Sequence, residues 1–254
     1  KLPLFTCAEK IDLSDCLLES LDLSGLDLHG INFDRSDFRN VNLNGANMSY
    51  CTTHNAFFGG SSLRGTNLSN AVLCSSDFRG CDMTGANICG ANMHCSALYR
   101  ADLTDLKVDE TTQYFHMRCP EEGPFIGWKV CFGRRVVQLL IPADARRIQG
   151  TWDEIKCEKA KVLTIKSPDF KEQYEEAHSY VDENFVYKRG EMVYAKGFTG
   201  NRFEESGGGI HVWLDRESAV KYLGEIKRKL EFFSNSFISS KKTACCPKCH
   251  SNHV

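Results

Sequence analysis

The C-terminal end of the sequence carries the residues best suited to metal chemistry. Cys246 and Cys249 form a C-x-x-C pair, and His253 follows four residues later. Two thiolates at this spacing can bind one tetrahedral metal ion, and Zn²⁺ accepts both cysteine and histidine ligands. A fourth ligand would have to come from Cys245 or from a distant thiol such as Cys119, because the chain has no second C-x-x-C pair. The spacing predicts half of a zinc site, with an unstructured tail as the competing interpretation.

His211 and two glutamates are the candidates for acid–base catalysis. His211 lies in the apolar stretch 210–213, and Glu204 and Glu205 precede it in a glycine-rich segment. Imidazole titrates near neutral pH, so His211 could act as a base or contact a ligand. The competing interpretation is a half-buried strand histidine whose ring is satisfied by the backbone. The glycines precede a predicted strand rather than a helix, which argues against a phosphate-binding loop.

Four side chains in the second half of the chain are candidates for binding a partner or a small ligand. They are Trp128, Arg202, His211 and Trp213. The two tryptophans could line a pocket, although large aromatic side chains belong equally often to a core.

A repeat must position any functional residue in the first half. From Ile11 to Asp105 the sequence repeats every five residues, and all but one of the pentad centres are large and apolar. The residue before the centre is mostly Asp or Asn, and Gly often closes the pentad. This period fits neither a helix nor a strand, but it suits a chain that turns a corner every five residues. Four such sides would close a coil of 20 residues, and stacked coils would pair at a spacing of about 4.8 Å.

Residues 20 apart should stack on one side of this coil. Phe38, Phe58 and Phe78 are pentad centres at that spacing, which predicts a stack of rings in the core. Thr53 is the one polar centre and predicts a weak or polar core layer near the middle of the repeat.

The pattern A(D/N)LxG is visible in residues 46–50, 86–90 and 101–105. These pentads resemble those of the pentapeptide-repeat family, and the resemblance covers residues 11 to 105. It implies an all-β right-handed quadrilateral β-helix, and it implies little about activity. Phe57 and Val72 replace the usual Asp or Asn and should point outward. They are candidates for a contact surface, or they are isolated exposed apolar residues.

The 13 cysteines are spread along a long chain, unlike those of a small secreted domain held together by disulfides. We therefore expect reduced thiols and a cytoplasmic location. Inward positions of the repeat hold Cys16, Cys51 and Cys81, and outward positions, which should be exposed, hold Cys74, Cys89 and Cys95.

The sequence changes character after Asp105. Residues 11 to 105 contain 11 acidic and 5 basic side chains, whereas the residues from 106 onward contain 21 acidic and 24 basic ones. We expect a β-helix over 1–105, a cap or connector over 106–118, a small α+β domain over 119–238 and a Cys/His-rich tail over 239–254.

Short apolar runs separated by turn residues indicate the elements of this second half. The predicted strands are 125–131, 135–141, 161–165 and 209–214. A hairpin is predicted where 185–187 and 192–198 flank Gly190. Asp215 is the predicted N-cap of a helix that runs to about residue 233.

Four blocks of the second half form a pattern of their own, namely 119–129, 141–147, 156–163 and 208–213. They resemble an uncharacterised domain that follows pentapeptide repeats in phage and bacterial proteins. The resemblance implies a bacterial or phage origin and gives no reaction. A faint likeness to the NAD-binding core of ADP-ribosyltransferases is weakened by Gly200, which stands where those enzymes carry a hydroxyl.

Composition limits the function further. The net charge of −2 argues against a strongly basic nucleic-acid binder, and no apolar run approaches the roughly 18 residues of a membrane span. We expect a non-catalytic interaction protein that binds a protein partner and modulates a host factor. The alternatives are a DNA-mimic inhibitor of type II topoisomerase, as the resemblance implies for some repeat proteins, sequestration of a small ligand, and an ADP-ribosyltransferase-like enzyme.

Overall fold

The computed structural model describes residues 11–204 and 208–224, which form two compact units. The first unit contains the described residues up to Pro124, together with Pro142–Lys159 and Tyr194–His211. The second contains Phe125–Ile141, Ala160–Val193 and the described residues from Val212 onward. No helix in the described ranges is long and apolar enough to cross a membrane.

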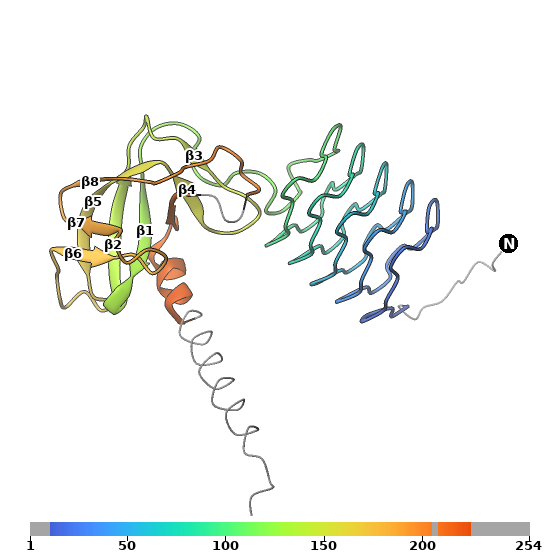
Figure 1. The fold of residues 1–254 in the computed structure, drawn as a ribbon, viewed down its shortest axis with the longest axis horizontal. Helices are drawn as coiled ribbons and strands as arrows, with labels where there is room; N and C mark the ends of the chain where they lie inside the picture. The colour runs from blue at the N-terminus through green and yellow to red at the C-terminus, as the bar shows by residue number, and fades with distance from the viewer. Residues whose placement is uncertain (1–10, 205–207, 225–254) are drawn as a thin grey trace, which may run out of the picture. The chain divides into compact units, whose positions relative to one another are not determined.

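The first unit contains a β-helix whose coils each take 20 residues. Parallel bridges join Asp12 to Asn32, Asn32 to Thr52 and Thr52 to Val72, and the other sides of the coil are bridged at the same spacing. The N–H groups of the pentad centres up to Met93 donate to carbonyls of the following coil, as from Leu13 to Asn32 at 2.7 Å. The coils stack along the blue-to-green part of the chain (Figure 1). The predicted 20-residue coil of four pentapeptides is confirmed.

The last residue of each pentad forms a corner of the coil. Every fifth position from 15 to 105 has a positive φ, between 54° and 75°. Glycine adopts this left-handed conformation without steric cost, which explains its frequency there. The residue before the pentad centre caps the same turn, since Asp12 Oδ1 accepts the Ser14 N–H at 2.9 Å. The Asp or Asn and the Gly of the pentad therefore serve one corner together.

Aromatic rings fill the core of the β-helix. The centroids of Phe38 and Phe58 are 4.6 Å apart with nearly parallel rings, and those of Phe58 and Phe78 are also 4.6 Å apart. All three side chains are fully buried, so the predicted stack is confirmed. Thr53 is buried as well, and its hydroxyl lies 2.9 Å from that of Ser76. The buried Thr53 hydroxyl thus has a hydrogen-bond partner within the core.

The outward cysteines are less exposed than their pattern suggests. Cys95 is exposed, but Cys74 and Cys89 are partly buried, so the expectation for these two is wrong. The next coil covers Cys74, whose Sγ lies 3.9 Å from the carbonyl oxygen of Asn92. Burial raises the pKa of both thiols.

The ladder of the β-helix continues beyond the last pentad. Asn87 bridges Lys107, and Asn92 bridges Gln113 after one extra residue. Where the next corner would follow, the Cys95 N–H donates instead to the carbonyl of Thr151 at 3.0 Å. A segment from the second half of the sequence therefore completes the hydrogen bonding of the last coil.

The remaining described chain is built from short strands. The main sheet has the order β1-β2-β5-β8, with the bounds Phe125–Cys131, Arg135–Ile141, Lys159–Lys166 and Met192–Tyr194. A second sheet contains β3 (Arg147–Ile148), β4 (Ile155–Cys157) and β9 (Ile210–Val212), and β6 (Glu176–His178) pairs with β7 (Val186–Lys188). β1 and β2 have the predicted bounds, and the short turn η1 (Phe132–Arg134) joins them.

The predicted hairpin around Gly190 is wrong. Gly190 has a φ of 83° and does lie in a turn, because the Glu191 N–H donates to the Lys188 carbonyl at 3.1 Å. The flanking strands, however, pair with other partners: β7 with β6, and β8 with β5. The local turn signal is correct, but each flanking strand pairs with an earlier strand of the chain instead of with the other.

Residues 216–224 are helical, and Asp215 caps them as predicted. The Ser218 N–H donates to Asp215 Oδ1 at 2.6 Å, and the Ser218 hydroxyl donates to Oδ2 at 2.8 Å. Ala219 on this helix is fully buried and belongs to a cluster with Trp213. The far end of the predicted helix lies outside the described residues.

Candidate functional site

One side of the β-helix carries exposed apolar side chains. Positions 17, 37, 57, 77 and 97 stack there through bridges at 20-residue spacing, and these five positions are named the Phe57 face. Leu17 is 72 % exposed and Phe57 is 50 % exposed. Phe57 thus points outward, as its place in the pentad predicts.

Arginines neutralise the carboxylates of the Phe57 face. Arg39 pairs with Asp37, and Arg79 pairs with Asp77, each with a nitrogen–oxygen distance of 2.5 Å. The arginine hydrogen bonds lower the pKa of both carboxyls, so both stay ionised and paired at neutral pH. Apolar side chains and ion pairs therefore alternate along this face.

Val72 lies on the neighbouring side of the coil. It bridges Thr52 and Asn92, and its side chain is half-buried. The two outward apolar residues that the pentads single out therefore do not share one side of the β-helix.

Asp82, on another side of the coil, carries a strongly perturbed carboxyl. The Thr84 hydroxyl donates to it at 2.6 Å and the Arg64 guanidinium at 2.8 Å. These hydrogen bonds lower the pKa of Asp82 to about 2. A carboxyl whose pKa is lower in the folded state than in the unfolded state stabilises the fold. This contribution is complete at pH values above the pKa of the unfolded state, which is about 4 for Asp. It is lost as the pH falls through the pKa of the folded state.

We expect the Asp82→Asn variant to be less stable than the wild-type protein near neutral pH, and the difference to vanish by about pH 2. Urea unfolding of both proteins across the acid range measures this. The Arg64→Gln variant should retain part of the pH dependence, because Thr84 still donates to the carboxylate. A stability difference that stays constant over the whole range would contradict the assignment.

The two candidate tryptophans pair with each other in the second unit. The N–H of Trp128 donates to the carbonyl of Trp213 at 2.8 Å, and the reverse bond has the same length. The Trp213 ring is buried against Val130 and Ala219, and Trp128 packs on the same cluster. Trp213 therefore belongs to a core, and the partly buried Trp128 packs against that core.

His211 meets a glutamate that the sequence pattern does not indicate. Its Nδ1 lies 3.4 Å from Oε1 of Glu154, and both side chains are partly buried. Glu204 contributes its backbone carbonyl, which accepts a hydrogen bond from the buried Lys156 ammonium. Glu205 lies outside the described residues. Glu154 is 57 residues away from His211 along the chain, so only the folded structure reveals this pair.

The Arg202 side chain contacts other residues of the first unit. Its guanidinium donates to the carbonyl of Phe115 and lies over the rings of Phe115 and Phe203, at 5.4 and 4.9 Å from their centroids. Burial lowers the pKa of Arg202. The cation–π contacts and the carbonyl show a side chain that anchors its own segment.

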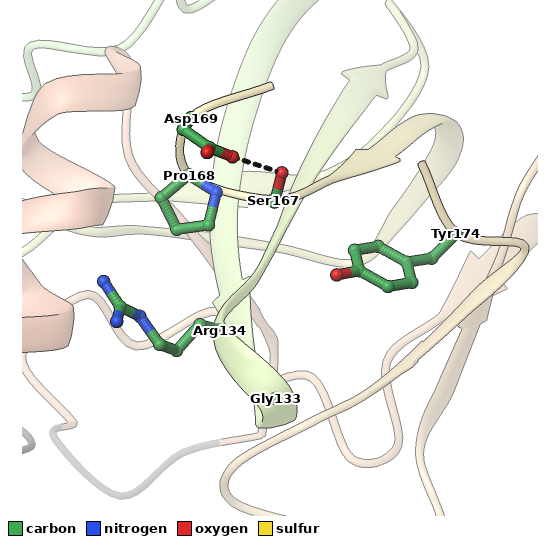
Figure 2. Close-up of a pocket in the computed structure, with 6 residues that line it drawn as sticks. All are labelled: Gly133, Arg134, Ser167, Pro168, Asp169 and Tyr174. Atoms are coloured by element: carbon green, nitrogen blue, oxygen red, sulfur yellow. Dashed lines mark hydrogen bonds between the residues drawn. The ribbon is translucent and has the colours of Figure 1, made fainter. Parts of the chain in front are cut away.

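A pocket of about 330 Å³ lies in the second unit beside η1. Its lining residues are Gly133, Arg134, Ser167, Pro168, Asp169 and Tyr174 (Figure 2). The Ser167 hydroxyl donates to Asp169 at 2.7 Å, and the Tyr174 hydroxyl donates to Glu172. Figure 2 shows the Arg134 guanidinium and the Tyr174 ring on opposite sides of the pocket. The lining thus contains one cationic side chain, Arg134, and one carboxylate, Asp169.

The predicted zinc ligands Cys246, Cys249 and His253 lie outside the described residues. Within the described ranges, no group of three or more His, Cys, Asp or Glu side chains could hold a metal ion. Cys119 and Cys157 are both buried there, and burial raises the pKa of Cys157 to about 12.

Similar solved structures are pentapeptide repeat proteins. One from the thylakoid lumen of Arabidopsis thaliana is 24 % identical, over 41 % of this chain and 72 % of that one, with a TM-score of 0.36. A second, from Nostoc PCC 7120, is 26 % identical over 33 % of this chain and 84 % of that one, with a TM-score of 0.31. HetL from Nostoc sp. PCC 7120 is involved in heterocyst differentiation regulation. It is 24 % identical over 38 % of this chain and 46 % of that one, with a TM-score of 0.26.

Family comparisons divide the chain in two. Residues 31–108 match a pentapeptide repeat region, and residues 11–49 match pentapeptide repeats. Residues 115–219 match a family of unknown function (DUF5758). A search of curated proteins found no match. The chain therefore contains pentapeptide repeats followed by a DUF5758 domain.

Proposed function

We propose that this chain is a non-catalytic interaction protein that binds a protein partner through the Phe57 face. The observation that carries the proposal is the half-exposed Phe57 ring on a regular β-helix. Aromatic side chains are enriched in protein interfaces, and a few of them supply most of the binding energy. The paired carboxylates Asp37 and Asp77 beside it suit a protein surface better than a strongly charged ligand.

The proposal includes the finer features that the resemblance implies. The coil is right-handed and quadrilateral, and the DUF5758 part is a small α+β domain. The protein acts in the cytoplasm of a bacterium or of a phage-infected cell, where its partner is a host factor.

The DNA-mimic alternative has less support from the charges of the repeat. Duplex DNA carries about one negative charge per 1.7 Å. In the β-helix, four carboxylates are paired with the arginines 35, 39, 64 and 79. If the alternative holds, micromolar protein inhibits supercoiling by DNA gyrase.

The Phe57→Ala variant tests the proposed contact. We expect it to lose about 2 kcal/mol of partner binding, roughly thirtyfold in Kd, if Phe57 is a hot spot. Its stability should change little, because the ring is half-exposed. The measurement is affinity capture from a bacterial lysate with quantitative mass spectrometry, followed by titration of the captured protein.

A matched control is Tyr50→Ala, which removes an aromatic ring that is 56 % exposed at a corner rather than on the Phe57 face. This variant should capture the same partner as the wild-type protein. Equal capture by wild type and Phe57→Ala would rule out the Phe57 face as the binding surface. Equal loss in both variants would contradict a contact that is specific to the Phe57 face.

A further inference from the structure

Side chains from three segments of the first unit meet at the Cys95 corner of the repeat. His94 Nε2 lies 3.5 Å from Cys95 Sγ and 3.4 Å from Asp153 Oδ2. The His94 ring also packs on Tyr114, with 4.4 Å between the ring centroids. Arg118 completes the group, since its Nη1 donates to Asp153 Oδ1 at 2.8 Å. A nucleophile, an imidazole and a carboxylate are therefore in contact.

Backbone hydrogen bonds hold this cluster in place. The Cys95 N–H donates to the Thr151 carbonyl at 3.0 Å, and the Thr151 hydroxyl donates to the Ser96 carbonyl at 2.6 Å. These bonds fix the segment that carries Asp153 beside the corner. The carboxylate is thus brought to His94 by the pairing of distant segments.

The contacts of His94 Nε2 decide which of its atoms carries a proton. Partial burial acts against ionisation of Asp153, but the Arg118 hydrogen bond and the nearby positive charges lower its pKa overall. An ionised carboxylate only accepts hydrogen bonds, so the Nε2 that faces it carries a hydrogen. The Cys95 sulfur lies 3.5 Å from the same Nε2, and a hydrogen-bond donor at this position favours the thiolate. The thiolate is the nucleophilic form of cysteine.

The other cysteines of the described ranges lack this environment. Of all the cysteines in these ranges, Cys95 is the exposed one. Burial raises the pKa of Cys74, and burial together with the Asp109 carboxylate raises that of Cys89. Burial raises the pKa of Cys81 and Cys131 to about 12. This contrast predicts that Cys95 reacts with oxidants faster than these other cysteines do.

We propose that Cys95, with His94 and Asp153, is a modification site at which hydroperoxides oxidise the thiol to sulfenic acid. In the reactive form, the thiol has given its proton to water, and the sulfur is a thiolate beside His94 Nε2. The sulfur lone pair attacks one oxygen of hydrogen peroxide, so that an S–O bond forms and the O–O bond breaks. The leaving hydroxide takes up the proton that the thiol released to the solvent and departs as water. Sulfur loses two electrons, and the peroxide gains them.

The test uses the full, reduced chain exposed to hydrogen peroxide in the presence of dimedone, which traps sulfenic acids. Peptide mass mapping then reports each cysteine separately, including those outside the described ranges. We expect Cys95 to be labelled at least about tenfold faster than Cys74 or Cys89. His94→Gln should slow labelling of Cys95 about tenfold, and Asp153→Asn should slow it less.

His54→Gln is the matched control. His54 occupies the same pentad position as His94 and also contacts a carboxylate, Asp34 at 3.1 Å, but Asn55 follows it instead of a cysteine. This variant should leave the labelling of Cys95 unchanged, and circular dichroism should show that both histidine variants fold. Labelling of Cys95 no faster than that of Cys89 would overturn the proposal. So would an unchanged rate in a folded His94→Gln variant, because exposure alone would then explain the reactivity.

Discussion

Replacing Arg147 by alanine is expected to lower the free energy of unfolding of the first unit by roughly 3–5 kcal/mol. Arg147 is only 9 % exposed. Its guanidinium donates to the backbone carbonyls of Pro120, Gly123, Pro142, Ala143 and Ala145, at 2.7 to 3.2 Å. Alanine would leave these carbonyls without their charged donor, and buried groups of this kind are costly to leave unpaired.

The neighbouring residue provides the control. Arg146 is largely exposed and pairs with Glu158 at 2.8 Å, so Arg146→Ala should leave the free energy of unfolding almost unchanged. Arg147→Lys should fall between the two, because an ammonium cannot reach acceptors on several sides at once. Urea unfolding, with hydrogen exchange of residues 120–123 and 142–145 as the local reporter, measures the effect. If the Arg146 and Arg147 variants unfold at the same urea concentration, the carbonyl network does not stabilise the fold.

The parts of the fold that could be predicted are those that short stretches of the sequence specify. The β-helix could be predicted because each corner and each core position is specified within one pentad. The 20-residue coil then sets which residues stack, as it does for Phe38 and Phe58. The bounds of β1 and β2 were also predictable, because both strands are apolar runs that end at turn residues. In these segments, residues that are neighbours in the sequence determine the local structure.

The candidate site was predicted less well because it depends on contacts between distant segments. Nothing near His211 indicates Glu154, and nothing near His94 indicates Asp153. The exposure of Cys74 depends on the backbone of the following coil, which its own pentad does not describe. The outward direction of Phe57 was predictable, whereas the side of the coil that it shares with Leu17 required the full register.

The largest effect in the repeat is expected for Phe58→Ala. Phe58 lies in the middle of the stacked rings and is fully buried, with neighbours on both sides at 4.6 Å between centroids. Loss of a buried phenylalanine costs about 3–5 kcal/mol, through lost transfer free energy and the cavity that remains. Neighbouring coils cannot collapse into this cavity easily, because the backbone ladder fixes their spacing.

Phe57→Ala is the control within the same pentad, and its cost should stay below about 1 kcal/mol because Phe57 is half-exposed. Urea unfolding compares the two variants, and hydrogen exchange should show that Phe58→Ala weakens the coils of Phe38 and Phe78 together. This coupling follows from the repeat, since each coil is stabilised mainly by contacts with its neighbours. Equal stability of the two variants would mean that the rings do not support the β-helix. A large loss in Phe58→Ala alone would show that one pentad separates two roles, with Phe58 holding the coils together and Phe57 free to contact a partner.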